Sequence, residues 1–261
     1  MERHLIDLNP ADIPSQFHPF LEDSTVYDSS CSRAARVYYI QKASGLFLKK
    51  APKGTLKKEA DLYGYFHKKG LAPEVLAYES LENDWLLTRE GFGQDCISPL
   101  YLSDPERLCD TTAQLLRMLH DTDFAGCPVP NRTFDYLTTA EENYRLQKYD
   151  LALFPDNWGY ASADEARKEL ESNGKFLKAD TLLHGDYCLP NILLNNWQFG
   201  CFIDLGAGGV GDRHIDLFWG MWSLQFNLKT DRFKDRFLDV YGRDQINTDC
   251  FRTVAAAEVF G

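Results

Sequence analysis

"LLHGDYCLPNILL", residues 182–194, places a carboxylate and a carboxamide between two apolar runs. Runs of Leu and Ile are typical of buried strands, so we expect a hairpin whose connecting segment carries Asp186 and Asn191. Buried polar side chains need partners, which either the backbone of an Asx-turn or a bound ligand supplies. The segment alone leaves both possibilities open.

The residues that follow favour a bound ligand. A further strand-like run, "QFGCFIDLG" at 198–206, ends on Asp204 and a glycine. The order H-x-D-x-x-x-x-N, followed after a strand by D-x-G, is that of kinase-type phosphoryl transfer. In that chemistry a carboxylate takes the proton of the acceptor hydroxyl, and Mg²⁺ is held by oxygen ligands. We therefore predict Asp186 as the base and Asn191 and Asp204 as metal ligands, with His184 as a hydrogen-bonded strut behind the loop.

The N-terminal third has the pattern of strands arranged around one helix. It predicts strands at 35–40 and 45–51, a helix at 56–69, and two further strands within 73–88. This pattern is typical of a small β-rich lobe.

This lobe is expected to supply a cation for phosphate, and Lys49 is the candidate. Glu59 lies on the inward stripe of the predicted helix, where a carboxylate is costly unless it is paired. A strand lysine paired with a helix glutamate fits the Lys–Glu pair of kinase folds. The other interpretation is that Lys49 and Glu59 are ordinary solvated charges. Lys50 is the alternative lysine, but strand alternation places it on the opposite face.

The loop at 27–36 contains no glycine, and the chain has no Walker A motif. Serine hydroxyl and backbone N–H groups can also bind phosphate, so Ser29, Ser30 and Ser32 are candidate donors in this loop.

From residue 92 onward the pattern is mostly helical. One helix is predicted to begin with Ser103 and Glu106 in a capping box. "EGFGQDC" at 90–96 carries two glycines and predicts a linker. We therefore expect an α+β fold of two lobes. Residues 1–91 would form a small β-sheet lobe with one main helix that binds the nucleotide, and 92–261 a larger, mostly helical lobe that carries catalysis and substrate binding.

Composition narrows the class of partner. The 261 residues carry a net charge of −11, which argues against nucleic acid or an anionic membrane surface as a partner. The same charge suits a cationic small molecule, although solubility alone also explains it. Neither a signal peptide nor a run of about 20 apolar residues is present, so we expect a soluble, cytoplasmic protein, monomeric or dimeric. The seven cysteines have no zinc-site spacing and are expected to be free thiols.

Several motifs together resemble a known family. With "CFIDLGAGGVGDRHIDLFW", "LLRMLHDTD" and "DRFLDVYG", the opening segment resembles the aminoglycoside 3'-phosphotransferases, the kanamycin kinases within the antibiotic and choline kinase superfamily. The resemblance implies a protein-kinase-like fold, ATP or GTP as phosphoryl donor, and Mg²⁺ at Asn191 and Asp204. It also implies transfer to the 3'-hydroxyl of an aminoglycoside, and hence antibiotic resistance.

The resemblance further implies which residues contact the nucleotide. They are Lys49 with Glu59 at the phosphates, Phe47 and Ile203 on the two faces of the base, Thr88 at the gatekeeper position, and Arg89 and Gly91 with backbone groups at the base edge.

For the acceptor, the resemblance implies an acidic pocket on the second lobe. Glu258 and Phe260 match the ending of the family's chain, and Asp156 matches an acidic loop position. Residues 135–171 hold nine acidic and four basic residues, which suits a cationic sugar, although a solvated helical face explains them equally well.

The chain also departs from the family's pattern. Ala207 and Ala257 replace an arginine and an acidic residue. The helix after "RHID" carries Trp219, Trp222 and Phe226 where the family has more charge. Two other functions therefore stay open: a kinase of another amino-alcohol such as choline or homoserine, and a nucleotide-binding pseudoenzyme.

Overall fold

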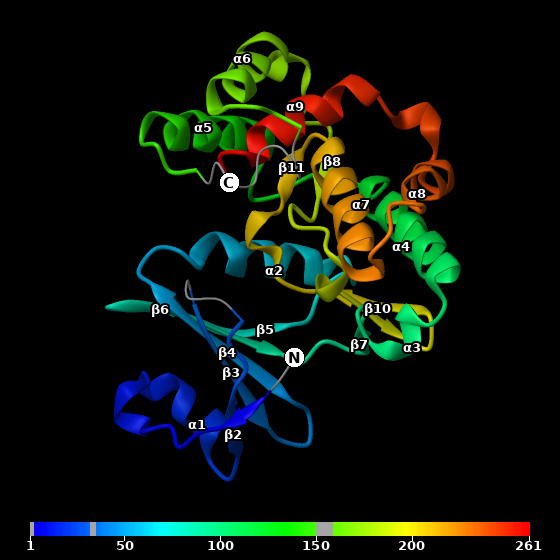
Figure 1. The fold of residues 1–261 in the computed structure, drawn as a ribbon. Helices are drawn as coiled ribbons and strands as arrows, with labels where there is room; N and C mark the ends of the chain where they lie inside the picture. The colour runs from blue at the N-terminus through cyan, green and yellow to red at the C-terminus, as the bar shows by residue number, and fades with distance from the viewer. Residues whose placement is uncertain (1–2, 32–34, 150–158) are drawn as a thin grey trace.

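The computed structural model describes residues 3–31, 35–149 and 159–261, which form two lobes (Figure 1). The first lobe contains an antiparallel sheet in the order β1-β2-β3-β4-β6-β5. Its strands are β1 (His4–Leu5), β2 (Thr25–Asp28), β3 (Arg36–Gln41), β4 (Leu46–Pro52), β5 (Val75–Ser80) and β6 (Asn83–Arg89). Both predicted strand pairs are present, since β3 pairs with β4 and β5 pairs with β6.

One main helix, α2 (Lys57–Lys68), lies between this sheet and the second lobe (Figure 1). Its apolar residues recur at helical spacing, so Leu62, Tyr63 and Phe66 are all buried. The short helix α1 (His18–Leu21) lies at the far end of the sheet (Figure 1). One face of α2 therefore packs against the sheet, and its first turn lies at the junction between the lobes.

The second lobe is mostly helical, as predicted. Helix α4 packs against α7 and α8, and α9 packs against α6 and α7. The helices are α3 (Pro99–Leu102), α4 (Pro105–His120), α5 (Arg132–Arg145), α6 (Ala163–Asn173), α7 (His214–Leu228), α8 (Lys234–Tyr241) and α9 (Thr248–Glu258). The expected α+β fold with a β-rich lobe and a helical lobe is confirmed.

The start of α4 differs from the expected capping box. The carboxylate of Asp104 accepts the Arg107 N–H at 3.2 Å and caps the helix. The Ser103 hydroxyl instead donates to the Leu100 carbonyl of α3. The capping box of Ser103 and Glu106 was therefore wrong, because a preceding short helix occupies Ser103.

The expected hairpin at 182–194 was also wrong. Strand β8 (Thr181–Leu183) pairs with β11 (Gly209–Gly211), whereas β9 (Ile192–Asn195) pairs with β10 (Gln198–Phe202). The segment between β8 and β9 therefore crosses from one small sheet to another. Its two ends are held by different partner strands.

The linker between the lobes contains the short strand β7 (Gln94–Asp95), which pairs with β9 of the second lobe. This pairing supports our proposal that the lobe boundary falls after residue 91. Among the described helices, none is long and apolar enough to cross a membrane.

Candidate active site

Lys49 and Glu59 form the ion pair predicted from sequence. The Lys49 Nζ lies 2.9 Å from each carboxylate oxygen of Glu59 and 3.1 Å from Asp204 Oδ1. Burial acts to lower the pKa of Lys49, but the two carboxylates outweigh it and raise that pKa. Burial also raises the pKa of Glu59, against the effect of the Lys49 charge. Lys50 lies on the other face of the strand, where its Nζ is 4.9 Å from the Trp85 ring centroid.

The loop after β8 holds Asp186 and Asn191 together. The Asn191 Nδ2 donates to Asp186 Oδ2 at 2.9 Å and to the Asp186 carbonyl at 3.0 Å. The backbone carbonyl of Asn191 accepts the Ile203 N–H at 3.0 Å, so Asn191 lies beside the end of β10 and the following Asp204. The three polar residues predicted from the motif therefore converge from two neighbouring segments.

The donor set fits a hard divalent cation. Asn191 uses its amino group towards Asp186, which leaves its carboxamide oxygen as a ligand. The Asp204 side chain is 54% exposed and projects from a residue in the left-handed region, with φ of 59°. The Tyr63 hydroxyl accepts the Asp204 N–H at 2.8 Å and fixes this backbone. One carboxylate and one carboxamide oxygen are thus presented at the junction of the lobes.

His184 acts as the expected strut. Its Nδ1 accepts the Asp186 N–H at 3.3 Å, so its Nε2–H donates to the Ile203 carbonyl at 3.0 Å. The ring is fully buried between the two polar loops.

A buried carboxylate that the motif analysis missed holds the loop from behind. Asp216, at the start of α7, accepts the N–H groups of His184 and Gly185, each at 2.7 Å. It also accepts the His120 Nε2–H at 3.2 Å, and burial lowers the pKa of His120 against the effect of the Asp216 charge. The sequence signal for Asp216 is a carboxylate inside the apolar run "HIDLFW", which demands a buried partner.

The residues expected around a nucleotide base lie near the linker. Phe47 is half-buried and pairs in register with Thr88. A Cβ at Gly91 would meet the side chains of Leu193 and Cys201 and lie 3.5 Å from Ile203, so a larger residue here would have to push these side chains aside.

Arg89 and the loop serines have partners within the protein. The Arg89 N–H donates to the Glu74 carbonyl at 2.9 Å, so the backbone group predicted to contact a base edge at this residue would be its carbonyl. The Ser30 N–H donates to Asp28 and its hydroxyl accepts the Val37 N–H, so this serine stabilises the loop itself. Ser29 is buried. Ser32 lies outside the described residues.

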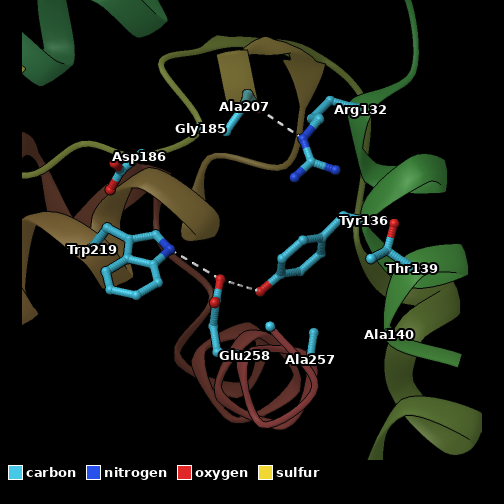
Figure 2. Close-up of a pocket in the computed structure, with 11 residues that line it drawn as sticks. Arg132, Tyr136, Thr139, Ala140, Gly185, Asp186, Ala207, Trp219, Ala257 and Glu258 are labelled. Carbon is cyan, nitrogen blue, oxygen red and sulfur yellow. Dashed lines mark hydrogen bonds between the residues drawn. The ribbon is translucent and has the colours of Figure 1, made fainter. Parts of the chain in front are cut away.

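A cavity of about 260 Å³ opens beside Asp186 (Figure 2). Glu258 lies across it, where the Tyr136 hydroxyl donates to its Oε1 at 2.6 Å and the Trp219 Nε1–H donates at 3.0 Å. Burial raises the pKa of Glu258 to about 7, against the effect of these two hydrogen bonds. The remaining lining residues are Arg132, Thr139, Ala140, Gly185, Ala207, Ala257 and Gly261.

Of the other two predicted acceptor residues, Phe260 is not among the residues that line this cavity. Phe260 is buried and makes edge contacts with Tyr144 and Tyr149, each with ring centroids 5.7 Å apart. Its position favours a packing role, which places helix α9 and Glu258, over the expected contact with the acceptor. Asp156 lies outside the described residues.

The aromatic departures extend from the cavity along α7. Trp219 lines the cavity and packs edge-on against Trp222, which stacks on Phe226 with centroids 5.0 Å apart. The side chains follow one face of the helix because they are spaced i, i+3 and i+7.

Taken together, the geometry suits transfer of a phosphoryl group to an alcohol. A paired lysine and oxygen ligands lie at the junction of the lobes, and a carboxylate stands between them and a cavity that can accept a hydroxyl.

Comparisons with known proteins agree with this geometry. The model of the phosphotransferase enzyme family (APH) matches residues 32–253. A probable aminoglycoside 3'-phosphotransferase of Lactococcus lactis is 44% identical over 255 residues, which cover 97% of each chain. An aminoglycoside 3'-phosphotransferase of Niallia circulans is 30% identical over 223 residues, covering 83% of this chain and 84% of that protein.

Solved structures share the fold at lower identity. The structure of an aminoglycoside-3'-phosphotransferase of type VIII has a TM-score of 0.72 at 21% identity, covering 99% of this chain and 94% of that one. The APH(3'')-Id enzyme of Streptomyces rimosus, in complex with ADP and streptomycin, has a TM-score of 0.71 at 18% identity, with coverage of 96% and 95%.

Proposed function

Because this chain belongs to the phosphotransferase enzyme family, we propose that it phosphorylates aminoglycoside antibiotics. The phosphoryl donor is ATP or GTP, and the acceptor is the 3'-hydroxyl. The observation that carries this proposal is the cavity that Asp186 and Glu258 both line, because one carboxylate can take the hydroxyl proton there while the other pairs with an ammonium group. Two relatives that match more than four fifths of this chain are named for the same activity, which supports it over choline or homoserine as the acceptor and over a pseudoenzyme.

The residues divide the reaction between the two lobes. Lys49, held by Glu59, binds the α- and β-phosphates and offsets their charge. Asp186 orients the acceptor hydroxyl and takes its proton as the oxygen–phosphorus bond forms. The bond between the γ-phosphorus and the bridging oxygen breaks, and the nucleoside diphosphate leaves with the electron pair. Catalysis is then mostly positioning and electrostatic stabilisation.

Asn191 and Asp204 would hold Mg²⁺, because they offer the hard oxygen ligands that it prefers. When bound, the ion supplies positive charge that stabilises the phosphate oxygens during transfer. Asn191 also donates to Asp186, so the ligand residue fixes the orientation of the base.

The nucleotide base is proposed to lie between Phe47 and Ile203, with Thr88 at its inner end and backbone groups of Arg89 and Gly91 at its edge; Phe47 pairing in register with Thr88, and Gly91 lying near Ile203, support this arrangement. Ser32 remains a proposed phosphate donor and Asp156 a proposed acceptor contact. ATP and GTP are cytoplasmic metabolites, so we place the reaction in the cytoplasm. The described cysteines are free, which suits that reducing compartment.

Phosphorylation would add negative charge to a cationic drug and weaken its binding to RNA, which gives resistance. The test is a coupled assay of ADP and GDP release with magnesium. Kanamycin, neomycin, a 3'-deoxy aminoglycoside, choline and homoserine serve as acceptors. We expect turnover of kanamycin and neomycin and none of the 3'-deoxy compound. Turnover of choline or homoserine alone would overturn the proposed acceptor, and no turnover with any of them would overturn the activity.

A further inference from the structure

Arg132 is a cation in the wall of the cavity that faces Asp186. It is the first residue of α5, and Figure 2 shows its guanidinium group directed into the pocket from that helix. Its Nε–H donates to the Ala207 carbonyl at 2.7 Å, and its Cζ lies 5.5 Å from the Tyr136 ring centroid. These two contacts fix the guanidinium plane, and among the described residues no hydrogen bond uses its two terminal amino groups, so these can meet a ligand.

In the part of the chain that the structure describes, no carboxylate lies within ion-pair distance of this cation, although its charge acts to lower the pKa of Glu258. Within residues 3–31, 35–149 and 159–261, Arg132 forms no ion pair, and neither does Lys58 in the first turn of α2. Burial lowers the pKa of Lys58, and the Arg132 charge lowers it further, whereas Asp135 acts in the opposite direction. Two unpaired cations therefore approach each other from the two lobes.

The position of these two cations indicates that their ligand is an anion. Ala207, whose carbonyl Arg132 contacts, closes the 3-10 turn Leu205–Ala207 that begins directly after Asp204. The cavity also carries the carboxylates of Asp186 and Glu258, but a guanidinium group still repels a cationic acceptor, so its presence points to an anionic ligand in the same cavity. In the proposed reaction, the group that arrives beside Asp186 with negative charge is the transferred phosphoryl group.

We propose that Arg132 binds the phosphoryl group during its transfer to the acceptor hydroxyl, with Lys58 of α2 adding positive charge nearby. This inference rests on the proposed function and adds a catalytic residue to it. A planar guanidinium with two free amino groups matches two phosphate oxygens at once, which an ammonium group cannot do.

The variants Arg132→Ala and Arg132→Lys test this role, with Arg145→Ala as the matched control at the other end of the same helix. We expect kcat of Arg132→Ala to fall about 100-fold or more, as when one donor to a transition state is removed. Both KM values should stay within about threefold, because the contact is made during transfer. Methylguanidine in solution should restore part of the activity of Arg132→Ala. The activity of Arg132→Lys should lie between those of Arg132→Ala and the wild type. Arg145→Ala should match the wild type.

Two results in this assay would overturn the inference. A purely structural role, in which Arg132 only fixes the Ala207 turn, would lower thermal stability and give no rescue by methylguanidine. A contact with the acceptor alone would raise the KM of the acceptor and leave kcat unchanged.

A binding measurement separates this inference from the proposed acceptor. With magnesium and no acceptor, aluminium fluoride should increase the affinity of the wild type for ADP by tenfold or more, because it mimics the phosphoryl group. Arg132→Ala should lose most of this increase and keep its affinity for ADP alone. An equal increase in both proteins would overturn the role of Arg132, whichever alcohol the enzyme phosphorylates.

Discussion

The Lys49 ammonium group lies 2.9 Å from both Glu59 carboxylate oxygens and 3.1 Å from Asp204, so one cation joins the sheet, helix α2 and the second lobe. Glu59 is 5% exposed, so its carboxylate depends on this partner.

Replacing the lysine should therefore destabilise the fold as well as stop catalysis. Lys49→Met leaves a buried carboxylate without its counter-ion, which costs about 3–5 kcal/mol of unfolding free energy. The double variant Lys49→Met/Glu59→Gln should recover part of that loss, since the buried charge is gone. Urea unfolding measures the free energy of unfolding of both variants. A single variant as stable as the wild type would show that Glu59 does not need Lys49 as its counter-ion.

Asp186 should be essential for turnover and dispensable for nucleotide binding. Asp186→Asn removes the group that takes the hydroxyl proton, so kcat should fall by about 100-fold to 10,000-fold. ADP affinity, measured by calorimetry, should stay near that of the wild type. Asp231→Asn, at an exposed position on the same lobe, is the control and should keep full activity. Near-normal turnover in Asp186→Asn would exclude the residue as the base.

Glu258 should make acceptor binding depend on pH near neutrality. Its pKa is raised from 4.5 to about 7, so it is mostly protonated below that pH and cannot pair with an ammonium group. The KM for kanamycin should rise about tenfold for each pH unit below 7. Glu258→Gln should remove this dependence and leave a high KM throughout.

The same raised pKa has a consequence for stability. The folded protein binds this proton more tightly than the unfolded chain does, so the contribution of Glu258 is complete below pH 4.5 and is lost as pH rises through about 7. Glu258→Gln should therefore stabilise the protein relative to the wild type at pH 8 and not at pH 4. Parallel unfolding curves for the two proteins across this range would contradict the assignment.

Asp216 should act on the loop rather than on substrate. Asp216→Ala leaves the buried N–H groups of His184 and Gly185 without acceptors, at about 1–3 kcal/mol for each. We expect a lower urea midpoint and a lower kcat, with Asp216→Asn less affected because its carboxamide oxygen still accepts one bond. Hydrogen exchange at residues 184–186 measures the loosening directly, and unchanged protection would contradict it.

The site residues that the sequence predicted share one property, which is that their roles follow from short-range spacing. Asp186, Asn191 and Asp204 stand at fixed intervals around strands, and Glu59 follows from helical periodicity. The structure brings these four residues together at the junction of the lobes.

What the sequence could not predict depends on contacts between distant segments. The partner of β8 is β11, not β9, because strand pairing is decided by packing that no local pattern records. Arg132 reaches Ala207 across 75 positions, and His120 reaches Asp216 across 96. Ser103 failed as a cap because α3 ends there, which shifts the start of the next helix by one residue.

The turn after Asp204 has a consequence for inhibitor selectivity. Only Leu205–Gly208 separates this aspartate from β11. The pairing of β11 with β8 fixes the end of this turn, and the hydrogen bond to the Tyr63 hydroxyl fixes its start at Asp204. A compound that needs the corresponding aspartate to swing outward and open a rear pocket would have to break this small sheet. Drugs that select an inactive conformation of human protein kinases should therefore bind this enzyme poorly, whereas compounds that fill the linker side, where Gly91 meets Ile203, have a preformed surface to fit.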